Sequence, residues 1–339
     1  MILGDFKGRS NNLHIMRFIA SVAVIFSHAY AATLGEGKSD IVNAFTKGKI
    51  SIGGIAVAMF FLCSGYLIAK SSTRQKGVAE FFSARLIRLI PPLALVIVVT
   101  VAVGAFITTL SFSEYFSSPV TYKYILNIIL LRQYELPGVF ESNPYSGSVN
   151  GALWTLPVEF LCYVVCYLCA RLGFFEKKRY AMTLPLVVIA AVGALFVSNT
   201  LLLAIRPCLL FYIGIGYFVF RDKIKLDIKW FIIAVIGFAV SFALNGVMIA
   251  FLVFFPYIMF VLWFGIKQCP DFIGVLGNYS YGIYLWGFFI QQLMMHFFGE
   301  MTVLSNFGIS AITSIILAII SYYITERPLE GKKLFVKKG

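Results

Sequence analysis

The chain has 339 residues, of which 60% are hydrophobic and only 13% are charged. Soluble domains usually carry about 25% charged residues, so this composition excludes an ordinary soluble globular protein and indicates a polytopic membrane protein. The formal net charge of +13 is also typical of nucleic-acid-binding proteins. Here, however, the basic residues are distributed as membrane orientation requires, and we expect no nucleic-acid partner.

Ten apolar segments reach the length of about 20 residues that a helix needs to cross a bilayer. They occupy residues 12–32, 50–69, 90–110, 152–170, 181–198, 200–220, 229–245, 247–266, 273–297 and 306–325. We therefore predict an all-α fold, a polytopic transmembrane helical bundle of about ten spans, as a single integral-membrane domain over residues 1–339. The apolar start is not expected to be a cleaved signal peptide, because it contains Arg and His and many apolar segments follow it.

The basic residues predict how these spans are oriented. If both termini are cytoplasmic, 21 of the 28 Lys and Arg residues lie on the cytoplasmic side, 5 lie on the other side and 2 are embedded. An excess of basic residues in cytoplasmic loops is the usual sign of orientation in inner-membrane proteins. We expect a multi-pass protein of the cell inner membrane, in contact with membrane lipid. In this orientation Arg17 is near the cytoplasmic side and His28 is near the outer side.

The first span holds two ionisable residues, Arg17 and His28. Eleven positions make about three helical turns, so both side chains project from one face, separated by about 16 Å along the axis. An ionisable group in hydrocarbon costs roughly 2.5–3.5 kcal/mol and is therefore a functional candidate. The alternative is an arginine that reaches the interface and a histidine that only packs.

The second span contains small residues followed by hydroxyl groups near its cytoplasmic end. Gly53 and Gly54, with the alanines that follow, allow helices to approach closely. Ser64 and Tyr66 add polar groups that we assign to a cofactor site. Packing alone is the alternative explanation for this segment, because small residues are common at helix contacts in membranes.

Arg85 and Arg88 precede the third span as an i,i+3 pair, so they are predicted to share a helical face. Two guanidinium groups together suit a phosphate or pyrophosphate, which they can bind in bidentate fashion. Pro91 and Pro92 are expected to redirect the chain into the span. The alternative is a basic anchor that binds lipid head groups.

Glu159 is the only carboxylate inside an apolar run, and it follows Trp154 and Pro157 at the start of the fourth span. Its predicted depth is comparable with that of His28. The two could form a pair in which the carboxylate orients a general base, or Glu159 could pair with a cation. One such cation is Arg206, embedded in the sixth span, which could instead stabilise a charged intermediate. A purely structural ion pair is the third possibility.

Two further features complete the chain. The six cysteines lie in or beside apolar segments without the spacing of metal ligands, so we interpret them as small buried hydrophobes and expect no metal site. The long loop 111–150 is rich in Tyr, Ser and Asn, a composition that suits a carbohydrate-binding face. Its tyrosines are Tyr115, Tyr122, Tyr124, Tyr134 and Tyr145.

Six blocks of the sequence, in chain order, resemble the motifs of the membrane acyltransferase-three family, the O-antigen and nodulation-factor acetyltransferase type. The resemblance extends over nearly the whole chain. The blocks are Arg17 with His28; Gly53-Gly54 through Ser64-Gly65-Tyr66; Phe82 with Arg85, Arg88 and Pro91; Trp154-Thr-Leu-Pro-Val-Glu159; Gly277-Asn-Tyr-Ser280-Tyr-Gly-Ile-Tyr284-Leu; and Thr325-Glu326-Arg327-Pro328.

The resemblance implies transfer of an acyl group, usually acetyl, from cytoplasmic coenzyme A to a glycan hydroxyl across the membrane. It also implies a role for individual residues. His28 would be the catalytic histidine, Arg17 its essential partner and Glu159 the carboxylate within the membrane. Arg85 and Arg88 would hold the phosphates of coenzyme A.

The sequence departs from the family pattern in two places. Many members carry a histidine soon after the Tyr-Leu pair, whereas this chain has Leu285-Trp286-Gly287. His28 is therefore expected to contribute more to catalysis here than in members that have this second histidine. Longer members also have an appended esterase-like domain, and the chain is expected to be a stand-alone member without one.

We therefore predict a membrane O-acetyltransferase that uses acetyl-CoA. The acceptor would be a cell-surface polysaccharide or lipid-linked glycan, specifically lipopolysaccharide O-antigen. His28 would deprotonate the acceptor hydroxyl or carry the acyl group transiently. One alternative is another acyl group or another acceptor, such as peptidoglycan or a small molecule. Another is a proton-coupled transporter or flippase with His28, Glu159 and Arg206 as a relay, although the chain lacks the duplicated halves of many transporters.

Overall fold

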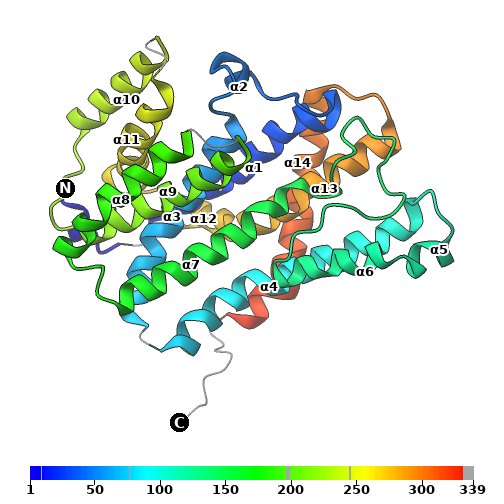
Figure 1. Cartoon of the computed structure of the whole chain (residues 1–339), viewed down its shortest axis with the longest axis horizontal. Helices are drawn as coiled ribbons and strands as arrows, with labels where there is room; N and C mark the ends of the chain where they lie inside the picture. The colour runs from blue at the N-terminus through cyan, green and yellow to red at the C-terminus, as the bar shows by residue number, and fades with distance from the viewer. Residues whose placement is uncertain (9, 76, 196–198, 244–245, 331–339) are drawn as a thin grey trace.

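The protein is described by a computed structural model that covers residues 1–8, 10–75, 77–195, 199–243 and 246–330. Over these residues the regular structure is helical, apart from one isolated β-bridge between Ile2 and Lys225. Helices suit a bilayer because every backbone polar group finds its partner within the segment. The predicted all-α architecture of a polytopic membrane protein is thereby confirmed (Figure 1).

Among the described residues, six helices are long and apolar enough to cross a membrane. They are α1 (Asn11–Leu34), α3 (Ile52–Arg74), α4 (Val78–Ile107), α7 (Thr155–Arg171), α11 (Val247–Phe260) and α14 (Val303–Ser321), the last three extended by adjoining 3₁₀ or π turns. Four further helices occupy the remaining predicted ranges. They are α8 (Lys177–Leu195), α9 (Asn199–Val219), α10 (Ile228–Ala243) and α13 (Ser280–Phe298). A helix therefore stands in each of the ten ranges, whereas the number of membrane spans stays a prediction.

Helix α13 is buried along most of its length, between α1 and α14. This position explains why it carries polar residues that a lipid-facing helix would avoid. Gln291 Nε2 donates a hydrogen bond of 2.8 Å to the carbonyl oxygen of Ile25 on α1. Gln292 Nε2 donates to the carbonyl oxygens of Tyr145 and Ser148 at 2.7 and 2.8 Å. Buried amides that are paired in this way attach α13 to α1 and to the loop before α7.

Helix α4 corrects the expectation for Pro91 and Pro92. The helix is continuous through both prolines and begins at Val78, so Arg85 and Arg88 belong to the same helix as the third span. Prolines are tolerated inside membrane helices where neighbouring groups satisfy the freed backbone. The hydroxyl of Tyr281 on α13 donates to the carbonyl oxygen of Leu89 at 3.0 Å and so connects α13 to this part of α4.

Helices α3 and α9 are in backbone contact through glycines. A Cβ atom on Gly65 would lie 2.0 Å from the carbonyl oxygen of Phe211, and one on Gly214 would lie 2.2 Å from that of Leu62. Gly53 also brings α3 close to α1, because a Cβ there would lie 2.9 Å from the side-chain oxygen Ser27 Oγ. Small residues thus fix α3 between α1 and α9, as the sequence predicted for its glycines.

Short helices cover the ends of the bundle: α2 (Ile41–Phe45), α5 (Phe112–Ser117), α6 (Pro119–Ile125) and α12 (Asp271–Gly274). The loop that holds α5 and α6 folds along α4, as Figure 1 shows. Tyr115 and Tyr124 of this loop are fully buried, and the Tyr115 hydroxyl donates to the carbonyl oxygen of Val101 at 2.9 Å. The expectation that the tyrosines of this loop form a carbohydrate face is therefore wrong for these two, which serve as core.

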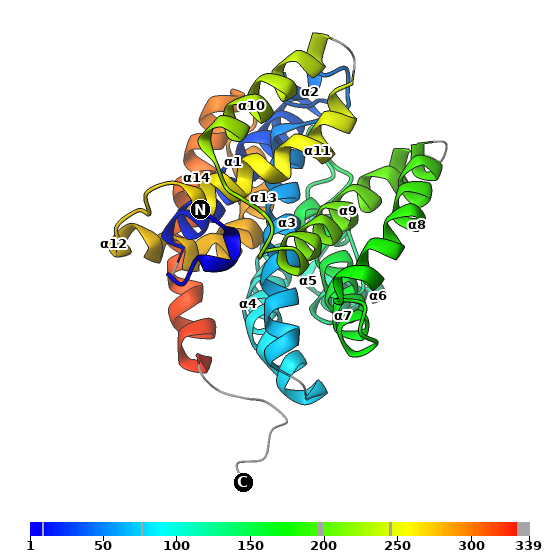
Figure 2. The same cartoon turned by 90° about the vertical axis from the view of Figure 1, so that its left-hand side faces the viewer.

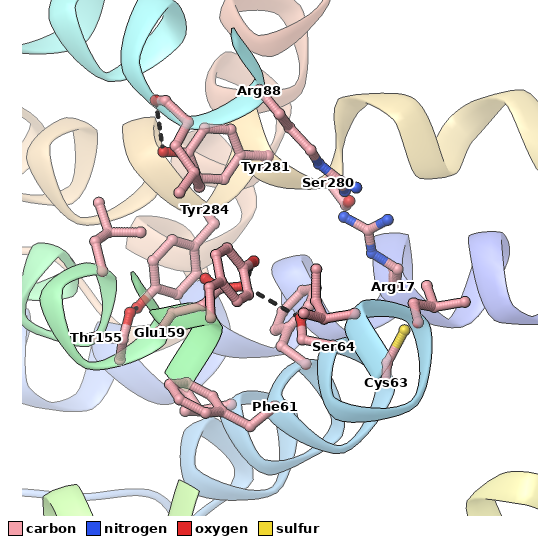
Figure 3. A pocket seen from close by; sticks show the side chains of 17 residues that line it. Arg17, Phe61, Cys63, Ser64, Arg88, Thr155, Glu159, Ser280, Tyr281 and Tyr284 are labelled. Carbon is pink, nitrogen blue, oxygen red and sulfur yellow. Dashed lines mark hydrogen bonds between the residues drawn. The ribbon is translucent and has the colours of Figure 1, made fainter. Parts of the chain in front are cut away.

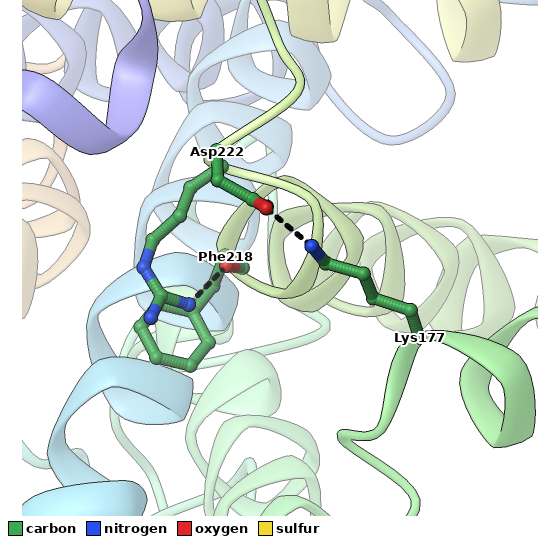
Figure 4. Close-up of polar contacts among 4 residues, drawn as sticks. Lys177, Phe218 and Asp222 are labelled. Atoms are coloured by element: carbon green, nitrogen blue, oxygen red, sulfur yellow. Dashed lines mark hydrogen bonds and ion pairs between the residues drawn. The ribbon is translucent and has the colours of Figure 1, made fainter.

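Charged side chains connect the start of α8 (Lys177–Leu195) with the loop that follows α9 (Asn199–Val219). Figure 2 shows α8 beside α9 and α10 beside α11. Lys177 at the start of α8 forms an ion pair with Asp222, which follows α9 (Figure 4). The guanidinium of Arg221 lies 4.2 Å from the ring centroid of Phe218 and donates to its carbonyl oxygen at 2.7 Å. These contacts tie the start of α8 to the end of α9.

Candidate active site

Three adjoining cavities follow the length of α1. The central cavity, of about 90 Å³, is lined among others by Arg17, Ser64, Arg88, Glu159 and Tyr284. The His28 cavity, of about 280 Å³, is lined among others by His28, Lys38, Trp154, Arg206 and Tyr284. The His14 cleft, of about 420 Å³, is lined among others by His14, Arg17, Arg88, Asn278 and Glu326.

Shared walls connect these cavities in sequence. Arg17 and Arg88 line both the His14 cleft and the central cavity. Val57 and Tyr284 line both the central cavity and the His28 cavity. Because α1 contributes Arg17 to one end of this series and His28 to the other, the predicted pair lines adjoining cavities rather than a single one.

Arg17 and Arg88 face each other across the central cavity, as Figure 3 shows. In the described part of the chain, salt bridges join Lys177 to Asp222 and Arg179 to Glu176, and neither of these two arginines takes part in one. The carboxylates of Glu159 and Glu326 line the same cavities without forming a salt bridge to either arginine, so they offset the repulsion between the two guanidinium groups only in part. An anion placed between them would relieve that repulsion and could be bound by both.

Arg85 occupies a different environment from Arg88, although both lie on α4. It is buried, and its Nη1 atom donates to Gln75 Oε1 at 2.7 Å and to the carbonyl oxygen of Phe81 at 2.6 Å. Its guanidinium also lies 3.8 Å from the ring centroid of Phe81. Arg85 lines none of the three cavities. The structure therefore separates two side chains that the i,i+3 spacing placed on one face.

Glu159 lies in the central cavity, on the first turns of α7. Its Oε1 atom accepts hydrogen bonds from Ser64 Oγ at 3.1 Å and from the hydroxyl of Tyr163. These bonds tie α7 to α3 and hold the carboxylate in the same cavity as Arg17 and Arg88. His28 lines the neighbouring cavity, so the geometry groups Glu159 with the arginines and not with the histidine. Arg206 lies on the His28 side.

Of the two hydroxyl residues assigned to a cofactor site, Ser64 lines the central cavity and Tyr66 does not. The ring of Tyr66 packs against Phe218 and Phe260, with centroid distances of 6.1 and 5.2 Å. The two residues follow each other closely on α3 but point to different sides of the helix. Tyr66 therefore belongs to the contact between α3, α9 and α11.

The imidazole ring of His28 packs against an aromatic side chain of α13. Its ring meets Phe288 of α13 edge to face, with centroids 5.1 Å apart. Among the described residues its Nδ1 atom has no hydrogen-bond partner. A neutral imidazole with an unpaired nitrogen in a cavity can accept a proton from a hydroxyl group.

Asp40 supports the histidine end of the site and was not predicted from the sequence. It is fully buried, accepts a hydrogen bond from the hydroxyl of Ser27, the residue before His28, and caps α2 by accepting from the backbone amide of Asn43 at 3.0 Å. It also accepts from the amide of Ile52 at 2.9 Å, at the start of α3. The available signal was an acidic residue just before a short helix in the loop between two spans, which indicates a cap rather than a site.

Gly287 explains the departure from the family pattern. A Cβ atom at this position would lie 2.7 Å from Cγ1 of Ile25 on α1, so α1 occupies the space that a larger side chain would need. The close approach places Phe288 of α13 against His28. A histidine at position 287 is therefore incompatible with this packing of α1 on α13.

Tyr284 separates the central cavity from the His28 cavity. Its hydroxyl donates to the carbonyl oxygen of Ala152 at 2.6 Å and lies 2.7 Å from the hydroxyl of Thr155. Both partners belong to the start of the α7 segment. The ring is thus held at the junction by two hydrogen bonds, and any group that passes between the cavities must pass this side chain.

Comparisons with known proteins identify the family of the chain. The family described as "Acyltransferase domain" matches residues 10–324. An O-acetyl transferase of Shigella phage Sf6 is 26% identical over 328 residues, which cover 94% of this chain and 96% of the phage protein. Nodulation protein 10 of Rhizobium leguminosarum bv. viciae is 28% identical over 197 residues, 56% of this chain and 51% of that protein.

No solved structure matches the chain. The family match favours acyl transfer over the transporter alternative, and it extends over all of the residues that line the central and His28 cavities. The chain therefore belongs to the membrane acyltransferase-three family, and it is a multi-pass membrane acyltransferase.

Proposed function

We propose that this protein transfers an acetyl group from cytoplasmic acetyl-CoA to a hydroxyl of a cell-surface polysaccharide, specifically lipopolysaccharide O-antigen. The proposal includes an inner-membrane location with about ten spans and cytoplasmic termini. The observation that supports it best is the series of adjoining cavities along α1, with two facing arginines at one end and His28 at the other.

The inner part of this series suits coenzyme A. Arg17 and Arg88 have no salt-bridge partner among the described residues, and Arg88 also opens to the His14 cleft. Phosphate oxygens would satisfy both guanidiniums with charge-assisted hydrogen bonds. Ser64 and Glu159 line the wall beyond them. The rise of about 16 Å between positions 17 and 28 of one helix is comparable with the reach of an extended pantetheine arm.

His28 would act on the acceptor. In the reaction the thioester C–S bond breaks, an ester C–O bond forms, and the hydroxyl proton ends on the thiol of coenzyme A. His28, which lines the outer cavity, would take that proton from the hydroxyl. Arg17 would bind the donor rather than touch the histidine, since the two line different cavities.

The test is acetyl transfer by the purified protein in lipid nanodiscs, with radiolabelled acetyl-CoA and O-antigen polysaccharide. We expect transfer by the wild-type chain and its loss in His28→Ala. The matched control is His296→Ala, at the end of α13, which lines neither the central cavity nor the His28 cavity. Mass spectrometry of the product identifies the acyl group and the sugar. Equal transfer by wild type and His28→Ala would overturn the assignment of the histidine.

A further inference from the structure

The His28 cavity is lined by cations from three separate segments. Lys38 follows α1, Lys49 follows α2, and Arg206 lies on α9. Among the described residues that line this cavity, none is Asp or Glu. The cavity around the proposed general base is therefore positively charged. The proposed acetyl transfer does not itself use these three side chains.

Arg206 is the most informative of the three because it is placed within a predicted span. Its Nη1 atom donates to the carbonyl oxygen of Lys49 at 2.8 Å, which fixes the side chain between α9 and the loop before α3. Its Nε atom is buried and has no hydrogen-bond partner among the described residues. A cation at such a depth is costly unless a partner satisfies it. Among the described residues, the carbonyl oxygen of Lys49 is the hydrogen-bond acceptor found for a guanidinium that has five N–H donors.

The carboxylate that packs against this region is already engaged. Asp40 is fully buried, and its two oxygens accept from the hydroxyl of Ser27 and from the amides of Asn43 and Ile52. It does not line the cavity. Glu159 is held in the central cavity by Ser64 and Tyr163. The negative charge that would balance Arg206 is thus absent from the described wall of the His28 cavity.

We propose that the acceptor itself brings this charge: the His28 cavity binds an anionic group of the glycan, and Arg206 is its principal ligand. The anionic group is the carboxylate of an acidic sugar or the phosphate of a lipid-linked glycan, near the hydroxyl that is acylated. Charge-assisted hydrogen bonds from Arg206 hold it, and Lys38 contributes at the rim. This inference rests on the proposed function, since it names the substrate class of the same site.

Binding of defined probes without acetyl-CoA tests the inference. The protein is placed in nanodiscs of phosphatidylcholine, so that no anionic lipid competes. One arm compares a galacturonic acid trimer with its methyl ester, which lacks the negative charges and adds one methyl group to each carboxyl. The other arm compares undecaprenyl phosphate with undecaprenol. Fluorescence reports binding, because Trp154 lines the cavity. We expect the anionic member of one pair to bind about tenfold or more tightly than its neutral partner.

Three variants assign this preference to the cavity. Arg206→Gln is expected to weaken binding of the preferred anionic probe by about tenfold, and Arg206→Lys to restore much of it. Lys38→Gln gives a smaller loss and covers the case in which Arg206→Gln fails to fold. The control is Arg132→Gln, an exposed cation of the loop 111–150 that does not line the cavity.

The two arms identify the source of the charge, since a preference for galacturonate indicates an acidic sugar and a preference for undecaprenyl phosphate indicates the lipid carrier. Equal binding of the charged and neutral members of both pairs would overturn the inference, as would unchanged anion binding in Arg206→Gln and Lys38→Gln. In the separate transfer assay with acetyl-CoA, loss of kcat in Arg206→Gln with neutral acceptors, at unchanged acceptor KM, would assign Arg206 to the reaction intermediate instead and overturn the inference. Because no acetyl donor is present, failure here is distinct from failure of the transfer assay with His28→Ala.

Discussion

The ionisable residues at the two ends of α1 have different charged and aromatic neighbours. At the inner end, Arg17 meets a second arginine, Arg88, in a small cavity that also contains the carboxylate of Glu159. At the outer end, His28 stands against Phe288 in a larger cavity whose charged lining residues are cations. Helix α1 therefore contributes the proposed donor-binding arginine to one cavity and the proposed proton acceptor to the next. Binding of the donor and chemistry on the acceptor are assigned to different cavities.

The largest effect should come from the double variant Arg17→Gln with Arg88→Gln. Each hydrogen bond to a charged group contributes about 1.5–3 kcal/mol, so coenzyme A affinity should fall about 100-fold or more, as measured by calorimetry in nanodiscs. Binding of acceptor probes should not change. Arg85→Gln is the matched control on the same helix, and its effect should be much smaller because its guanidinium is engaged by Gln75 and Phe81. An equal loss for Arg85→Gln and Arg88→Gln would contradict this division.

A second variant disturbs only the outer end. Gly287→His places a side chain where Ile25 already lies, and overpacking of this kind costs about 1–3 kcal/mol or more. We expect a lower melting temperature and a loss of transfer, with coenzyme A affinity retained. Ile25→Ala in the same chain should recover part of the stability. Gly308→Ala on α14 is the control, because a Cβ there meets nothing within 4 Å. Full stability of Gly287→His would show that α1 and α13 are not packed as described.

Asp40→Asn should have an intermediate effect. It removes the charge that accepts from Ser27, beside His28, and a buried hydrogen bond of this kind is worth about 1–3 kcal/mol. We expect kcat to fall about tenfold, with the affinity for coenzyme A unchanged. Thr46→Val, a buried hydroxyl of the same loop that bonds only to backbone groups, is the control. A parallel loss of coenzyme A affinity in Asp40→Asn would show that the two ends of α1 are not independent.

The smallest effect concerns the ion pair far from both cavities. The hydrogen bond from Lys177 lowers the pKa of the Asp222 carboxyl. Its contribution to stability is therefore present above the ordinary Asp pKa and is lost as pH falls through the lowered value. Because both side chains are exposed, the contribution is small. Melting temperatures of wild type and Asp222→Asn should differ slightly at pH 7 and converge near pH 3, with transfer unaffected.

The fold was largely predictable because a bilayer leaves few alternatives. An apolar run of sufficient length must be helical, and helices stand in all ten predicted ranges. The prediction was wrong at Pro91 and Pro92, because a general rule for helices in water does not hold for a membrane helix, which here continues through both prolines. It was also wrong for Tyr115 and Tyr124, because composition does not show which side of a loop faces the protein.

The candidate site was predictable where a single helix determines the geometry. Arg17 and His28 line adjoining cavities because eleven residues return to one face of α1. The neighbours of Glu159 were harder to predict, because they depend on how α7 packs against α3 and α1. Arg85 shows a further limit, because the contacts with Gln75 and Phe81 turn it away from its i,i+3 neighbour. Asp40 lies outside the spans, so hydropathy could not reveal it.

The ring at the junction of the two cavities has a consequence for the cell as well as for catalysis. A membrane that maintains a proton gradient cannot contain an open water-filled channel. The proposed enzyme takes its acetyl donor from one side of the membrane and its acceptor from the other, so it needs a route between the two sides. Tyr284, held by Ala152 and Thr155, lines both cavities and lies where that route would run. In the proposed reaction, electrical insulation and passage of the acetyl group would therefore depend on the same phenol.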